Sequence, residues 1–139
     1  MRERAELLLG YVGLSAYAGE LARNLPFGHQ RRLEIARALA VNPKVLLLDE
    51  PAAGLTHGEI EDLVRLIRDL KRMGVTIILV EHHVEMIMDV SDHVTVLDYG
   101  EVIASGPPAT VARDPKVIEA YFGGALPSVE ATANLEPGR

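Results

Sequence analysis

Two uniformly apolar runs separated by a long amphipathic segment are the feature that most constrains the fold of this chain. Residues 44–48 (KVLLL) and 75–80 (VTIILV) show no alternation of apolar and polar side chains, which is typical of strands covered on both faces. Within residues 57–74, apolar side chains recur at helical spacing: Ile60, Leu63, Ile67 and Leu70. A strand, a helix and a strand in this order predict two parallel strands joined by a right-handed crossover, and therefore an α/β fold.

Polar residues follow both predicted strands directly. Asp49 and Glu50 come after the first strand, and Glu81 and His82 come after the second. The carboxyl ends of parallel strands meet at one edge of a sheet, where ligands bind in α/β proteins, so we expect these side chains to converge. An aspartate after a buried strand holds Mg²⁺ in many nucleotide hydrolases, and a second acid can polarise the attacking water. The alternative explanation is that the two charges only end a buried strand and favour solubility.

Two further features also have more than one explanation. His82 is a candidate phosphate sensor, but a single histidine is more often structural. The adjacent His82 and His83 are also compatible with zinc, whose remaining ligands would then have to come from elsewhere in the chain. Gly28 lies just before a predicted helix at residues 29–42, where it would let backbone N–H groups approach an anion. A plain loop that starts a helix explains the same glycine.

The remaining segments predict short elements around this core. Helices are expected at residues 4–9, 29–42, 83–91 and 114–124, and a β-hairpin at residues 93–106. The hairpin is expected to turn at Tyr99 and Gly100. Asp114 is predicted to cap the last helix, with Pro115 at its first position and Gly123 as its stop. Residues 1–124 are expected to form the folded part, and residues 125–139, which lack periodicity, a disordered tail.

Composition limits the classes of protein to which the chain can belong. Its 139 residues, of which 48% are hydrophobic, suffice for one globular domain. The net charge of −6 disfavours nucleic acid as a partner, because a phosphate-backbone binder normally carries a basic face. The absence of cysteine excludes disulfides and cysteine-ligated zinc. The longest apolar run is far shorter than the ~20 residues that span a bilayer, so any membrane link is expected to go through a partner.

Four motifs occur in an order that resembles the ATPase subunits of ABC transporters. The segment LPFGHQRRLEIARAL, residues 25–39, resembles the signature motif and its helix. VLLLDEP, residues 45–51, resembles the Walker B strand, and AAGLT, residues 52–56, the D-loop. ILVEHHVEMI, residues 78–87, resembles the strand that leads to the switch histidine. The amino-acid sequence of these segments is most similar to that of the ATP-binding subunits of branched-chain amino-acid importers. The resemblance covers nearly all of residues 1–124.

The resemblance implies a fold and a role for each matching residue. The implied fold is a partial P-loop NTPase (RecA-like) sheet with parallel strands, crossover helices and a C-terminal β-hairpin, without the N-terminal half. Asp49 would hold Mg²⁺ through water, Glu50 would be the catalytic carboxylate, and His82 would contact the γ-phosphate of ATP. The residues implied to contact the nucleotide include those of the signature: Leu25, Pro26, Phe27, Gly28, His29 and Gln30. They also include the D-loop residues Gly54, Leu55 and Thr56, which would face a partner subunit.

The chain departs from the family pattern in two ways. Pro26, Phe27 and His29 stand where the signature usually has serine, glycine and glutamine, and Thr56 stands where the D-loop often has an acid or its amide. The 139 residues contain no G-x-x-x-x-G-K-[ST] loop, which the family carries in its N-terminal half and which cradles the phosphates. The chain therefore resembles the C-terminal part of such a subunit, and we expect it to bind ATP weakly or not at all when alone.

Two functional hypotheses follow from the resemblance. In the first, the chain is the C-terminal part of an ATP-binding and ATP-hydrolysing subunit of an importer, of the branched-chain amino-acid type, that couples hydrolysis to transport. Its partners would be a second ABC ATPase subunit, as a homodimer or heterodimer, and transmembrane permease subunits. It would lie in the cytoplasm, peripheral to the inner face of the membrane. In the second, it is a non-catalytic truncated remnant that only binds an ABC subunit or a permease.

Overall fold

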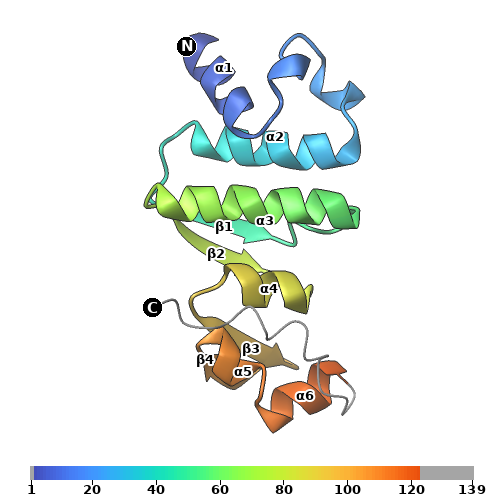
Figure 1. Cartoon of the computed structure of the whole chain (residues 1–139), viewed down its shortest axis with the longest axis vertical. Helices are drawn as coiled ribbons and strands as arrows, with labels where there is room; N and C mark the ends of the chain where they lie inside the picture. Colours follow the sequence, from blue (N-terminus) through green and yellow to red (C-terminus); the bar gives the residue numbers. More distant parts are fainter. Residues whose placement is uncertain (1, 123–139) are drawn as a thin grey trace, which may run out of the picture. The chain divides into compact units, whose positions relative to one another are not determined.

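The computed structural model describes residues 2–122 of the chain (Figure 1). These residues form two compact units, of which the first ends at His82 and the second begins at His83. The tail expected at residues 125–139 and the helix stop expected at Gly123 lie outside the described residues. Within residues 2–122, no helix is both long and apolar enough to cross a membrane.

The first unit contains a parallel pair of strands joined by a helix, as predicted. Strand β1 (Val45–Asp49) pairs with β2 (Thr76–Val80) in a register that runs from Val45 opposite Thr76 to Asp49 opposite Val80. Helix α3 (His57–Arg72) forms the connection between them (Figure 1). Before β1, the chain forms α1 (Arg2–Tyr11), two 3-10 turns, η1 (Ser15–Tyr17) and η2 (Ala22–Asn24), and α2 (Phe27–Leu39).

Helix α3 begins and ends at recognisable sequence signals. Thr56 and Glu59 form a capping box at its start, in which each side chain bonds to the backbone N–H of the other. Gly74 follows its end with a φ of 84°, a left-handed conformation that glycine adopts without steric cost. The apolar side of the helix is buried, including Leu63, Ile67 and Leu70. The predicted crossover helix is therefore confirmed.

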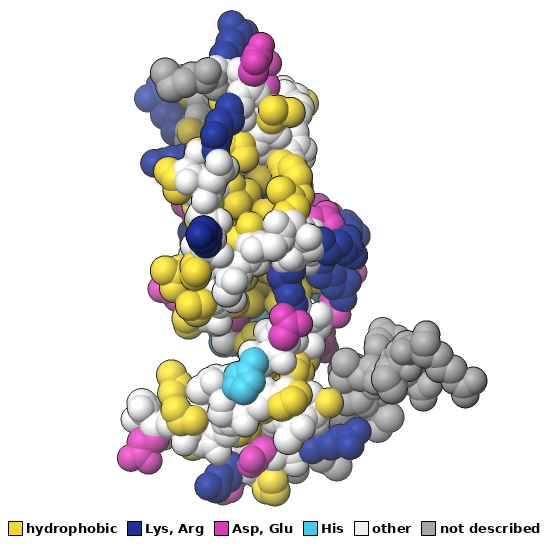
Figure 2. All heavy atoms as spheres, turned by 90° about the vertical axis from the view of Figure 1, so that its left-hand side faces the viewer, with side chains coloured by type: hydrophobic (Ala, Val, Ile, Leu, Met, Phe, Trp, Pro, Cys, Tyr) yellow, Lys and Arg dark blue, Asp and Glu magenta, His cyan; other side chains and the backbone are white. Residues whose placement is uncertain are grey.

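The two strands are covered on one face only within the described residues. In β1, Leu46 and Leu48 are buried, whereas Val45 and Leu47 are 48% and 73% exposed. Ile78 and Val80 of β2 are also at least half exposed, and other apolar side chains lie open on the surface (Figure 2). The uniformly apolar pattern is typical of strands covered on both faces, but the described residues cover one face only. Successive side chains of a strand point to opposite faces, so a uniformly apolar strand with one packed face leaves the other face apolar and open.

Helix α2 begins earlier than predicted. It starts at Phe27, directly after Pro26, whose extended backbone (φ −54°, ψ 151°) occupies the N-cap position. Gly28 therefore lies inside the first helical turn and is buried, rather than in a loop before the helix. Helices α2 and α3 lie side by side (Figure 1), and Arg32 of α2 forms an ion pair with Asp62 of α3.

The second unit contains the predicted antiparallel hairpin. Strands β3 (Val94–Asp98) and β4 (Glu101–Gly106) pair across a two-residue turn in which Tyr99 and Gly100 have φ values of 46° and 83°. Positive φ at both central residues is the conformation that matches the twist of a hairpin. Helices α4 (Val84–Val90), α5 (Pro108–Val111) and α6 (Pro115–Phe122) complete the unit, around a core of Val94, Val111 and Val117.

The last helix starts as the sequence predicts. Its first residue is Pro115, and a side-chain oxygen of Asp114 accepts a hydrogen bond of 2.9 Å from the backbone N–H of Lys116. This bond satisfies one of the N–H groups that a helix leaves without an intrahelical partner at its start. The short helix α5 and the two 3-10 turns were not predicted, because three or four residues are too few to show a period.

Candidate functional site

The candidate site begins at the carboxyl ends of β1 and β2. The ladder between these strands extends one residue past β1, since the backbone N–H of Glu50 donates to the carbonyl oxygen of Val80 at 2.8 Å. This bond places Glu50 beside the end of β2, which leads directly to Glu81 and His82. The predicted convergence of the polar residues after the two strands is therefore confirmed.

Glu50 and His82 are neighbours at this edge of the sheet. The Oε1 atom of Glu50 lies 4.0 Å from Nδ1 of His82, and both side chains are more than half exposed. A contact between side chains this open to water contributes little to stability. Their exposure leaves both groups accessible to a ligand. Asp49, the preceding residue, is also exposed at the last position of β1.

Glu50 adopts an unusual backbone conformation. Its φ is 44°, in the left-handed region that residues with a Cβ rarely occupy. Such a conformation costs on the order of 1–3 kcal/mol and persists where surrounding contacts enforce it, often at functional sites. Here the Glu50 carbonyl oxygen accepts a 3.1 Å bond from the N–H of Ala53, which turns the chain sharply away from the strand.

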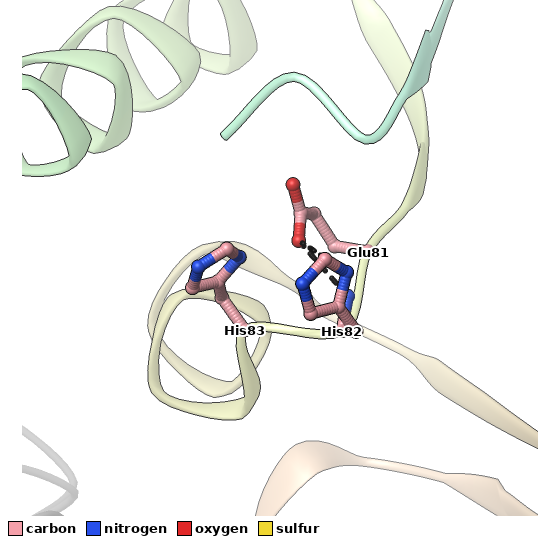
Figure 3. Close-up of side chains that lie close together, drawn as sticks. All are labelled: Glu81, His82 and His83. Carbon is pink, nitrogen blue, oxygen red and sulfur yellow. Dashed lines mark hydrogen bonds and ion pairs between the residues drawn. The ribbon is translucent and has the colours of Figure 1, made fainter. Parts of the chain in front are cut away.

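Glu81 is a residue of this site to which the sequence analysis gave no role. Its side chain exposes none of its surface. One carboxylate oxygen, Oε1, accepts a hydrogen bond from the backbone N–H of Ala52 at 2.9 Å. The other, Oε2, accepts one from the backbone N–H of His82, also at 2.9 Å (Figure 3). The sequence carries a signal for this role, since Glu81 directly follows an apolar strand. An acid that is buried in such a place needs hydrogen-bond donors around its carboxylate.

The signature residues lie at the start of α2. Leu25 is buried, and its carbonyl oxygen accepts a 2.9 Å hydrogen bond from the side-chain amide of Gln30, which holds the segment against the first turn. The ring of His29 packs on that of Tyr17 with a centroid distance of 4.8 Å. Phe27 is half exposed, and the guanidinium of Arg31 lies 5.0 Å from the centre of its ring. The first turn of a helix presents backbone N–H groups that favour an anion.

The D-loop segment packs closely against this first turn. Gly54 has a φ of 75°, and a Cβ atom placed there would lie 2.9 Å from the ring of Phe27. A Cβ atom at Gly28 would overlap the carboxylate of Glu59. Both glycines thus lie where the signature turn and the segment that follows β1 approach each other closely. The structure brings Phe27 and Gly28 together with residues 54–59, a contact that the sequence alone did not predict.

Thr56 has a structural role in addition to its predicted place in the D-loop. Glu59 accepts hydrogen bonds of 2.8 Å from both the backbone N–H and the hydroxyl of Thr56. These two bonds, with a smaller contribution from the positive charge of Arg32, hold the pKa of the Glu59 carboxyl below its ordinary value. On the same helix, the hydrogen bond from Arg65 lowers the pKa of Asp62.

A small cavity lies between α2 and the end of β1. Its volume is about 160 Å³. Charged groups of Arg31, Glu34 and Asp49 line it, together with Ile35, Ala38, Leu47, Leu48 and Pro51. Ligand pockets usually have volumes of ~300–1,000 Å³, so this cavity is too small for a whole nucleotide.

The residues present fit a magnesium ion better than they fit a complete nucleotide. Asp49 and Glu50 offer exposed carboxylate oxygens, and Mg²⁺ is commonly held by one or two carboxylates together with water and phosphate oxygens. For ATP, the first turn of α2 and His82 are the predicted phosphate contacts. A Walker-type phosphate loop is not among the 139 residues, so further phosphate contacts would have to come from other residues.

Comparisons of the sequence identify two matching families. A family described as "ABC transporter" matches residues 1–53, and one described as "Branched-chain amino acid ATP-binding cassette transporter" matches residues 101–126. Over 122 residues the chain is 44% identical to the high-affinity branched-chain amino acid transport ATP-binding protein BraF of Pseudomonas aeruginosa, and 43% identical to LivG of Escherichia coli K12. Each alignment covers 87% of this chain and 48% of the relative, so the chain spans about half the length of these curated relatives.

Solved structures match the fold over a similar part of their length. The ADP conformation of MJ1267, an ATP-binding cassette of an ABC transporter, has a TM-score of 0.79 and 35% identity, and the match covers 87% of this chain and 49% of that one. A second match is cbiO1 from Clostridium perfringens, part of the ABC transporter complex cbiONQ, with a TM-score of 0.74 and 30% identity. This match covers 96% of this chain and 53% of that one. The expected fold class, a partial P-loop NTPase sheet, is therefore confirmed.

Proposed function

Because the chain belongs to the family of ABC transporter ATP-binding proteins, we propose that it supplies the hydrolytic half of the nucleotide site in an importer ATPase. The observation that carries this proposal is the pair at the strand ends, where the Glu50 carboxylate lies 4.0 Å from the ring of His82. We further propose branched-chain amino acids as the transported substrate, a choice that rests on the similarity to BraF and LivG.

In the proposed reaction, Glu50 acts on the water that attacks the γ-phosphorus of ATP. Its carboxylate accepts a hydrogen bond from that water and takes its proton as the new P–O bond forms and the bond to ADP breaks. Asp49 would hold Mg²⁺, which when bound neutralises charge on the phosphates. His82 would donate a hydrogen bond to an oxygen of the γ-phosphate. The exposure of these three side chains supports their access to a ligand.

Further contacts to the nucleotide and the membrane would come from outside these 139 residues. We propose that a phosphate-loop-bearing segment covers the open face of β1 and β2, where Val45, Leu47, Ile78 and Val80 are 48–73% exposed. Burial of apolar surface is worth about 25 cal/mol per Å², which favours such a covering. A second ATPase subunit and permease subunits would complete the assembly on the inner face of the membrane.

A gain-of-activity experiment tests the proposed function. The chain is joined behind the N-terminal half of BraF or LivG, which gives what we call the joined protein, and Mg²⁺-dependent release of phosphate from ATP is measured. We expect hydrolysis by the joined protein and a strong loss of it in the His82→Ala variant. A matched control is Glu61→Gln, since Glu61 lies exposed on α3 beside His57. A folded joined protein that binds ATP without hydrolysing it would contradict the proposal.

The second candidate function is a non-catalytic binding module. The open apolar face of β1 and β2 favours it, because such a face can bind a family partner with or without catalysis. The joined protein separates the two candidates. Under the binding hypothesis, the chain associates with an intact ATPase subunit or a permease, yet the joined protein has no more activity than its Glu50→Gln variant.

A further inference from the structure

We propose that Glu81 is a positioning residue that ties the backbone of the switch histidine to the segment leading from Glu50 into the D-loop. Its effect on hydrolysis rests on the function proposed above. The hydrogen-bonded tie itself is a property of the chain and does not depend on nucleotide.

The tie consists of one buried carboxylate with two backbone donors. Oε1 of Glu81 accepts from the N–H of Ala52 at 2.9 Å. Oε2 accepts from the N–H of His82 at the same distance (Figure 3). The side chain is fully covered, whereas those of Glu50 and His82 are more than half exposed. A buried carboxylate is stable only where its oxygens are hydrogen-bonded, so these contacts fix its position.

The two tied segments carry the candidate catalytic groups. Ala52 lies two residues after Glu50, whose own N–H is bonded to Val80 at the end of β2. The carbonyl oxygen of Ala52 accepts a 3.1 Å bond from the N–H of Leu55, so Ala52 also starts the turn that contains Gly54. His82 is the other end of the tie. One carboxylate thus controls the spacing between the candidate general base and the candidate phosphate sensor.

This arrangement gives a physical route from the phosphate contact to the D-loop. A displacement of the His82 backbone on phosphate binding or release moves a donor of Glu81, and the other oxygen of the same rigid carboxylate transmits the movement to Ala52. The segment from Ala52 to Thr56 would follow, and Gly54 is packed against Phe27 of the signature turn. We therefore assign to Glu81 the coupling of these two segments rather than contact with the substrate.

The substitution Glu81→Gln removes one acceptor of the tie, together with the negative charge that lies 3.8 Å from Nδ1 of His82. Glutamine has nearly the same shape, but only one of its terminal atoms accepts a hydrogen bond, and its NH₂ group would face one of the two N–H donors. Backbone hydrogen exchange of the full chain without nucleotide is measured by NMR. We expect exchange at Ala52 or His82 to rise about tenfold or more, because a lost bond opens the segment locally. Exchange at Ile67 in the core of α3 should not change, which reports that the variant is folded.

Glu81→Asp and Glu61→Gln complete the first test. Aspartate retains the charge but is one methylene shorter, so it cannot span both donors and should also raise exchange. Glu61→Gln removes an exposed carboxylate of α3 and should leave the exchange of Ala52 and His82 unchanged. Should Glu81→Gln not fold, Glu81→Asp provides the same readout. Unchanged exchange at both amides in a folded Glu81 variant overturns the proposal.

Kinetics of the joined protein provide the second test. Glu81→Gln should lower kcat for ATP about tenfold or more while changing KM less than threefold, because positioning affects the reacting groups more than ground-state binding. Raised exchange together with an unchanged kcat overturns the coupling role and leaves Glu81 merely structural. If the wild-type joined protein does not hydrolyse ATP, the proposed function fails, and the exchange measurement alone decides whether the tie exists.

Discussion

Substitution of Gly54 by alanine tests the packing of the D-loop segment against the signature turn. The backbone at Gly54 has a φ of 75°, and the left-handed conformation costs a residue with a Cβ roughly 1–2 kcal/mol. The added Cβ would also lie 2.9 Å from Cε1 of Phe27, a separation that real Cβ atoms do not show. Because Phe27 is 49% exposed, its ring can move away, and the steric part of the penalty should stay at or below ~1 kcal/mol.

We therefore expect Gly54→Ala to destabilise the chain by about 1–3 kcal/mol in urea denaturation followed by circular dichroism. Gly58→Ala is the matched control, since Gly58 lies in the first turn of α3 with nothing within 4 Å of an added Cβ. Alanine is favoured over glycine in helices, so this control should be neutral or stabilising by up to ~1 kcal/mol. Adding Phe27→Ala should remove the steric part of the Gly54→Ala penalty and retain the backbone part. Equal stability of Gly54→Ala and the wild-type chain would refute this account of the contact.

Three further predictions follow from the same structure. The chain alone should show no micromolar affinity for ATP by calorimetry and no Mg²⁺-dependent turnover, since it lacks a phosphate loop; turnover that is abolished by Glu50→Gln would contradict this. The folded-state pKa of Glu59 is lowered, so its contribution to stability is present above its ordinary pKa of 4.5 and is lost as the pH falls through the folded value. Glu59→Gln should therefore lose less stability on acidification below pH 4.5 than the wild-type chain, as measured by urea midpoints, and an identical loss would be contrary evidence. Leu47 is 73% exposed on the open strand face, so we expect the chain to self-associate through this face and Leu47→Asn to reduce that association in concentration-dependent light scattering, with little change in stability. Unchanged association would mean that the open strand face is not the contact.

The parts of the fold that the sequence predicted are those with a strong local signal. The crossover helix α3 has four apolar residues at helical spacing. The hairpin turn at Tyr99 and Gly100 contains a glycine, which adopts a positive φ without steric cost. Both were predicted, as was the cap at Asp114. The start of α2 was placed two residues late because Phe27 and Gly28 are poor helix formers, and the contact of this turn with residues 54–59 outweighs their local preference.

The parts that could not be predicted depend on contacts between distant residues. The exposure of one face of β1 does not follow from VLLLD, since the same apolar run fits a strand covered on one face or on both. Likewise, the sequence places Glu81 beside His82 but does not reveal that Ala52, 29 residues earlier, donates to its carboxylate. The Thr56–Glu59 capping box has the T-x-x-E spacing that signals a helix start, so this contact is a local feature of the sequence in addition to the D-loop resemblance of Thr56.

The most direct test of the central claim is a comparison of ATP binding and ATP hydrolysis in the Glu50→Gln variant of the joined protein. If Glu50 acts on the attacking water, the single-turnover rate should fall by a factor of ~10²–10⁴, the usual contribution of a general base. The affinity for ATP should stay within about threefold of the wild type, because the reacting proton is not part of ground-state binding. A hydrolysis rate close to that of the Glu61→Gln control, with ATP bound normally, would contradict the account of this site.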